Sequence, residues 1–186
     1  MRANALTVIH KYLRREMFDF AQQLFRAGPE DCASVVRALK SLVETLQQHA
    51  RQEEVRFEPL LRELDPTLAE RLHEDHRRLE QDLEAIVELA NRLEPSAPGC
   101  RESLTRLHLD WNRYLSRYLA HLDDEERTLF FALEDRIPPV GMLANIAKEG
   151  GAQGGDLLLK IWAVTTCEER LAIERATETL ARSNAA

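Results

Sequence analysis

Residues 49–54 read HARQEE, and residues 121–126 read HLDDEE. In both copies a histidine precedes a glutamate by four residues, which places the two side chains on one face of a helix, one turn apart. Each copy follows a helical pattern that carries one histidine on its apolar stripe, His10 in the first case and His76 in the second. The sequence therefore indicates a duplicated pair of helices.

The composition is typical of a single soluble helical domain. The chain has 186 residues, of which 44% are hydrophobic and 31% charged, with a net charge of −7. The negative charge argues against a nucleic-acid partner, and no apolar run approaches the ~20 residues of a membrane span. The first 18 residues carry charges where a secretory signal would be apolar. The three cysteines form no C-x-x-C pair, so neither a disulfide framework nor a thiolate zinc site is implied, and we expect a cytoplasmic protein.

Four long helical patterns are separated by short breakers. They cover about residues 4–27, 31–64, 66–93 and 100–136. They are separated by Gly28-Pro29, Asp65-Pro66 and the PSAPG segment at 95–99. Pro59 predicts a kink inside the second pattern, whose buried stripe is expected to continue through Phe57 and Leu60. Such short connections favour antiparallel neighbours. We therefore predict an all-α protein with an up-down-up-down four-helix bundle over residues 1–137.

The remaining residues, 138–186, are predicted to form a short helical extension. A Gly-rich linker at 150–155 precedes the apolar run LLLKIWAV. A last helix then begins at Thr166, with Glu169 in the spacing of a capping box. We interpret this extension as a lid or a packing surface. In the second case it would dock a partner or a second copy of the chain, and the latter would give a homodimer.

The apolar stripes of the predicted helices also carry histidine and glutamate residues, which are unusual at buried positions. Charged side chains are almost never buried without a partner. At 1.5 Å per residue along each helix, six histidine and glutamate residues of these stripes fall at one level of the bundle. They are His10, His49, Glu53, His76, His121 and Glu125. Two histidines and one glutamate per half suit a dinuclear site. Imidazole with carboxylate fits iron, and also manganese or zinc. The alternative is a metal-free scaffold of hydrogen-bonded core histidines.

Three further residues lie close to this level. Tyr118 is a candidate hydrogen-bond donor to a ligating group. His73 lies at the edge of its stripe, which favours a rim position over a fifth histidine ligand. Asp75 either lines an access route or is exposed to solvent.

The order H…HxxxE…H…HxxxE over about residues 4–136 resembles the hemerythrin-like (HHE cation-binding) family. The resemblance implies two iron ions, joined by an oxo or hydroxo bridge. It places His10 and His49 on one iron and His76 and His121 on the other, with Glu53 and Glu125 bridging them. Oxygen-carrying hemerythrins have a fifth histidine from an H-x-x-x-H pair on the third helix, whereas here the spacing from His73 to His76 is three.

The resemblance also implies a class of chemistry. We expect a non-haem di-iron protein that binds or reduces a small oxidant, namely oxygen, nitric oxide or peroxide. The alternative is an iron-sensing or redox-sensing regulatory module, which the metal stabilises and which has no catalytic turnover. Whether the protein is an enzyme stays open at this point.

Overall fold

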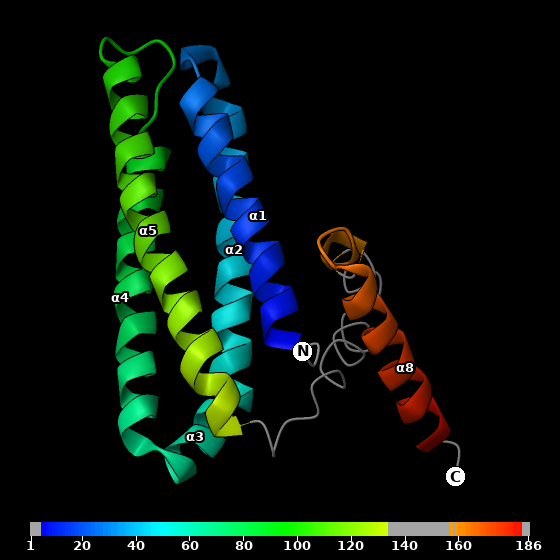
Figure 1. The fold of residues 1–186 in the computed structure, drawn as a ribbon. Coiled ribbons are helices and arrows are strands. Elements are labelled where there is room, and N and C mark those ends of the chain that lie inside the picture. Colours follow the sequence, from blue (N-terminus) through cyan, green and yellow to red (C-terminus); the bar gives the residue numbers. More distant parts are fainter. Residues whose placement is uncertain (1–4, 134–156, 158, 184–186) are drawn as a thin grey trace. The chain divides into compact units, whose positions relative to one another are not determined.

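The computed structural model describes residues 5–133, 157 and 159–183, and these residues form helices and no strand. The prediction of an all-α protein is thereby confirmed. The helices, shown in Figure 1, are α1 (Ala5–Arg26), the short 3₁₀ helix η1 (Pro29–Asp31), α2 (Cys32–Arg56), α3 (Glu58–Leu64), α4 (Pro66–Asn91), α5 (Cys100–Leu133) and α8 (Cys167–Ser183).

The chain divides into two compact units. One consists of Glu16–Ala132, and the other combines Met1–Arg15 with Leu133–Ala186. Helix α1 continues without a break through the boundary between Arg15 and Glu16. The predicted division at residue 137 and the up-down-up-down order of the helices stay predictions.

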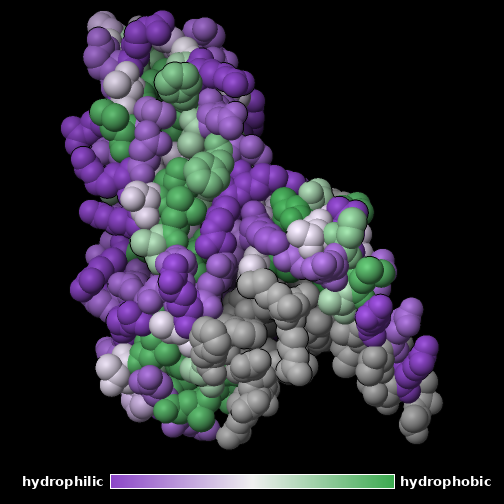
Figure 2. All heavy atoms as spheres, in the orientation of Figure 1, coloured by the Kyte–Doolittle hydropathy of each residue, from purple (hydrophilic) through white to green (hydrophobic). Residues whose placement is uncertain are grey.

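Within Glu16–Ala132, the long helices pack through the apolar stripes that the sequence predicts. The ring of Phe20 on α1 meets that of Trp111 on α5 edge to face, with centroids 4.7 Å apart. Arg71 on α4 pairs with Asp124 on α5 at 2.8 Å. The core of this unit includes Met17, Leu24, Val35, Leu39, Leu46, Leu79, Leu83, Leu107 and Leu122. Figure 2 shows an apolar band among the hydrophilic side chains that cover the long helices.

The second predicted helix is broken near Pro59, as expected for a proline inside a helical pattern. Helix α2 ends at Arg56, and α3 begins at Glu58 with Pro59 in its first turn. The break changes which side chain faces inward. The sequence pattern placed Leu60 on the buried stripe, but Leu61 is the buried residue and Leu60 is half-buried. The prediction for Leu60 was wrong because it continued one helical period across the break.

Helix α4 begins as its sequence predicts. Asp65 is the N-cap, and its Oδ1 accepts a hydrogen bond of 3.0 Å from the backbone N–H of Leu68. Pro66 occupies the first helical position, where its missing N–H costs nothing. This cap fixes the start of the helix that carries His76.

The cap can be tested by substitution. We expect Asp65→Ala to lower the free energy of unfolding by about 1 kcal/mol, because the N–H of Leu68 loses its acceptor. Asp65→Asn keeps a side-chain oxygen at the same place and is expected to retain most of the stability. Urea denaturation of the two variants and the parent measures the difference, and equal losses for Ala and Asn would contradict the capping role.

The unit formed by the two ends of the chain contains α8. Its capping box is confirmed: the N–H of Thr166 donates to Glu169 Oε2 at 2.8 Å, and the N–H of Glu169 donates to Thr166 Oγ1 at 3.2 Å. Glu169 also pairs with Lys11 of α1 in the same unit. The predicted Gly-rich linker at 150–155 and the predicted end of the fourth helix at Arg136 lie outside the described residues.

Candidate metal centre

The two HxxxE sequences each form a compact pair inside the helical unit. On α2, His49 Nε2 lies 3.3 Å from Glu53 Oε1. On α5, His121 Nε2 lies 3.2 Å from Glu125 Oε1. All four side chains are buried, as the one-turn spacing on an inward-facing stripe predicts.

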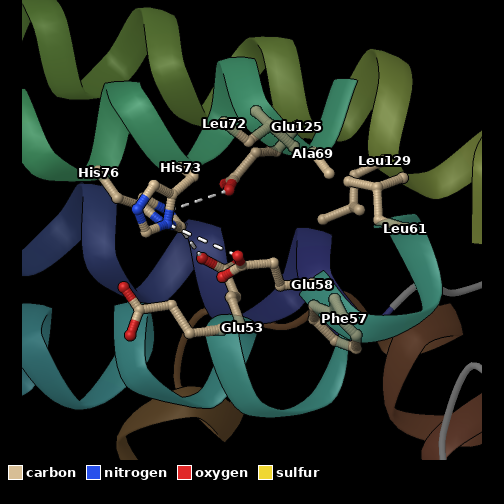
Figure 3. Close-up of a pocket in the computed structure, with 11 residues that line it drawn as sticks. Glu53, Phe57, Glu58, Leu61, Ala69, Leu72, His73, His76, Glu125 and Leu129 are labelled. Atoms are coloured by element: carbon tan, nitrogen blue, oxygen red, sulfur yellow. Dashed lines mark ion pairs between the residues drawn. The ribbon is translucent and has the colours of Figure 1, made fainter. Parts of the chain in front are cut away.

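His76 on α4 lies between the two carboxylates. Its Nε2 is 3.4 Å from Glu53 Oε2 and 3.5 Å from Glu125 Oε1, and its side chain is 13% exposed. Its ring also meets that of His121 edge to face, with centroids 4.6 Å apart. One imidazole from α4 thus joins the carboxylates of α2 and α5 (Figure 3).

These five residues form two overlapping groups of potential metal ligands. In one group, ligand atoms of His49, Glu53 and Glu125 lie within 4.8 Å of one another. In the other, ligand atoms of Glu53, His76, His121 and Glu125 meet the same limit. The two groups share both carboxylates. Imidazole nitrogens and carboxylate oxygens are suitable donors for first-row transition metals, so the chemistry of this donor set fits a metal ion.

His10, the remaining predicted ligand, is on α1 before residue 16 and therefore in the unit formed by the chain ends. Its side chain is completely buried. Its role as a metal ligand stays a prediction.

The three predicted neighbours occupy different surroundings. The ring of buried Tyr118 lies 6.0 Å from that of His121, and burial raises the pKa of its phenol well above the usual value. His73 is partly exposed, with Nδ1 3.6 Å from Glu58 Oε1. Asp75 is half-buried, and its Oδ1 is 3.9 Å from Arg78 on the same helix. Neither His73 nor Asp75 belongs to the two ligand groups found among the described residues.

A small cavity lies directly beside the carboxylates and His76 (Figure 3). Its volume of about 20 Å³ is enough for roughly one water-sized molecule. Its apolar wall consists of Phe57, Leu61, Ala69, Leu72 and Leu129, and its polar lining consists of Glu53, Glu54, Glu58, His73, His76 and Glu125.

The sequence did not single out Phe57 and Glu58 as part of the site. Both lie at the break between α2 and α3, where the chain turns beside the ligand groups. The signal that pointed to this place was Pro59, because it predicted the break. The apolar pattern alone did not show that the break lines a cavity.

Comparison with known proteins identifies the family. The profile of the hemerythrin HHE cation binding domain matches residues 2–133, which is most of the chain. The protein therefore belongs to the hemerythrin HHE cation binding domain family, in agreement with the resemblance seen in the sequence. Searches of curated proteins and of solved structures found no match. No helix among the described residues is both long and apolar enough to span a bilayer.

When no metal is bound, the net charge of the site depends on the protonation of His76. Burial lowers the pKa of its imidazole, but the hydrogen bonds to Glu125 and Glu53 and the charges of these two carboxylates outweigh burial and raise it to about 10. In the metal-free protein at neutral pH, His76 is therefore protonated and partly compensates the two buried carboxylates.

We expect the stability of the metal-stripped protein to depend on pH through His76. Its native pKa of about 10 lies above the ordinary value of 6.5, so its contribution is complete below pH 6.5 and is lost as the pH rises through about 10. The free energy of unfolding should fall across this range. Urea titrations in the presence of a chelator measure it, and the same slope in His76→Ala would contradict the assignment.

Proposed function

We propose that this protein is a non-haem di-iron protein that binds or reduces a small oxidant, namely oxygen, nitric oxide or peroxide. One observation carries the proposal. Two groups of imidazole and carboxylate ligands share Glu53 and Glu125, and a carboxylate has two oxygens with which to contact two ions. The family's cation-binding character supports the same reading.

In this proposal the ligands divide between the two ions as the duplication of the helix pair suggests. His10 and His49 hold one iron, His76 and His121 hold the other, and Glu53 and Glu125 bridge them. His10 is included because the order H…HxxxE…H…HxxxE begins with it, and the family profile covers its position. A bound pair of irons would supply the electrons for reduction of an oxidant. Manganese or zinc would fit the same donors.

The cavity beside His76 supports a small ligand over a large substrate. It has room for about one water-sized molecule, and its far wall is apolar. Burial of Tyr118 favours the neutral phenol, which is thus a hydrogen-bond donor close to His121. The residues that line this cavity would thus limit the size of the molecule that reaches the carboxylates and His76.

Metal content tests the ligand assignment. We expect about two iron ions per chain after iron-replete expression, and a large loss of iron in His121→Ala, because an imidazole ligand is removed. His108→Ala is the matched control: His108 is on the same helix and contacts Asn112 at 3.0 Å, away from the ligand groups. Elemental analysis measures both variants. Full iron content in His121→Ala, or no metal in the parent, would refute the proposal.

A substitution that fills the cavity tests whether the ligand enters through it, independently of metal binding. Ala69 is buried in the cavity wall, so Ala69→Leu should leave the iron content unchanged and reduce the rate of nitric oxide binding at least several-fold. Ala85→Leu adds the same bulk to the exposed face of the same helix, α4, and should bind at the parent rate. Stopped-flow absorption measures the rates. Equal rates in both variants would show that the ligand enters elsewhere.

A second candidate is a metal-stabilised regulatory or interaction module. It is favoured by Leu159 and Leu171 in the C-terminal part of the chain, whose side chains are 71% and 51% exposed. Large exposed apolar residues are typical of docking surfaces when they are grouped. A homodimer formed through this part would be weakened by Leu159→Ser together with Leu171→Ser without loss of iron. Sedimentation analysis measures the mass, and an unchanged oligomeric state would remove this support.

A further inference from the structure

Two cysteines from distant parts of the sequence meet inside the helical unit. Cys32 is the first residue of α2, and Cys100 is the first residue of α5. They are 68 positions apart in sequence, but their Sγ atoms lie 3.4 Å from each other. The sequence, with three cysteines and no C-x-x-C pair, gave no sign of this pairing. It depends on which helix ends the fold brings together.

The pair is enclosed by apolar side chains. Cys32 and Cys100 are 2% and 4% exposed and form a cluster with Leu104, while Ala27 and Leu93 pack against it. Burial, together with the hydrogen bond to Cys100, raises the pKa of the Cys32 thiol to about 11. Cys32 is therefore a thiol at neutral pH. By contrast, Cys167 is exposed.

We propose that Cys32 and Cys100 form a dithiol that hydroperoxides oxidise to an intramolecular disulfide. This inference does not depend on the metal centre. Cys32 precedes His49 by 17 residues on α2, which corresponds to about 25 Å along the helix axis. The pair is thus a separate site from the ligands described above.

The oxidation proceeds in two balanced steps. The sulfur of one thiol attacks an oxygen of hydrogen peroxide and the O–O bond breaks. The thiol proton goes to the departing hydroxide, and the products are a sulfenic acid and water. The second thiol then attacks the sulfenic sulfur, the S–S bond forms, and a second water leaves. Overall, two thiols lose two hydrogen atoms and one peroxide becomes two waters. The buried thiols make the first step slow, but the adjacent partner directs the product to a disulfide.

The bond would join the two helix pairs of the duplicated fold. Cys32 belongs to the pair α1 and α2, and Cys100 belongs to the pair α4 and α5. A cross-link between residues so distant in sequence restricts the unfolded chain strongly. We therefore expect the oxidised protein to unfold at a temperature several degrees higher than the reduced protein.

The experiment uses the full chain with Cys167→Ala, which leaves only the buried pair. Treatment with hydrogen peroxide should remove the mass of two hydrogen atoms, speed migration in a denaturing gel without reductant, and raise the unfolding temperature. Dithiothreitol should reverse all three changes. Cys32→Ala and Cys100→Ala in the same background are matched controls, and each should lose the response. Because the main measurement leaves both cysteines of the pair intact, it does not depend on whether these controls fold.

Three results would overturn the proposal. The first is a gain of oxygen atoms at Cys32 or Cys100 without loss of hydrogen, which indicates sulfinic acid. The second is a disulfide between two chains. The third is a disulfide that forms but leaves the unfolding temperature unchanged or lower, because the bond would then not fit the native helix ends.

Discussion

The structure depends on the burial of two carboxylates. Glu53 and Glu125 are 4% and 1% exposed, and removing an ion from water costs several kcal/mol even after the protein relaxes. Imidazoles from three helices lie within 3.5 Å of these groups. A cation held by these carboxylates would compensate their charge, and the chain belongs to the hemerythrin HHE cation binding domain family.

This constraint also explains the positions of the helices. The ligand groups include residues from α2, α4 and α5, so none of these helices can rotate about its axis without moving a ligand. The local signals that start and stop the helices therefore affect the site directly. The Asp65 cap is one example, because it sets the beginning of α4 and hence the position of His76 along it.

The parts of the fold and site that the sequence predicted are those governed by local spacing. The HxxxE pairs, the Asp65 cap and the Thr166 capping box each depend on residues within four positions of one another, and helical geometry alone relates them. The break at Pro59 was also expected, since proline interrupts the helical hydrogen bonds. The convergence of the two HxxxE pairs required more, namely a comparison of levels between helices. That comparison put Glu53 and His76 at one level, and their side chains lie 3.4 Å apart.

The parts that the sequence missed depend on the relation between distant segments. Leu61 is buried, and not the expected Leu60, because the break between α2 and α3 changes the helical phase. The contact of Cys32 with Cys100 is invisible in a pattern that treats each cysteine as a small apolar residue. The cavity beside Glu58 likewise requires the positions of side chains from four helices. None of these features has a local signature.

The break between α2 and α3 makes the two halves of the duplication unequal. The cavity that it helps to form touches His76, Glu53 and Glu125, but neither His49 nor His121 lines it. The HxxxE sequence is repeated on α2 and α5, but the cavity does not reach the histidines of the two repeats equally with His76. A molecule arriving through it would meet His76 and the two carboxylates before it met His49 or His121, so the histidines of the site would differ in what they encounter first.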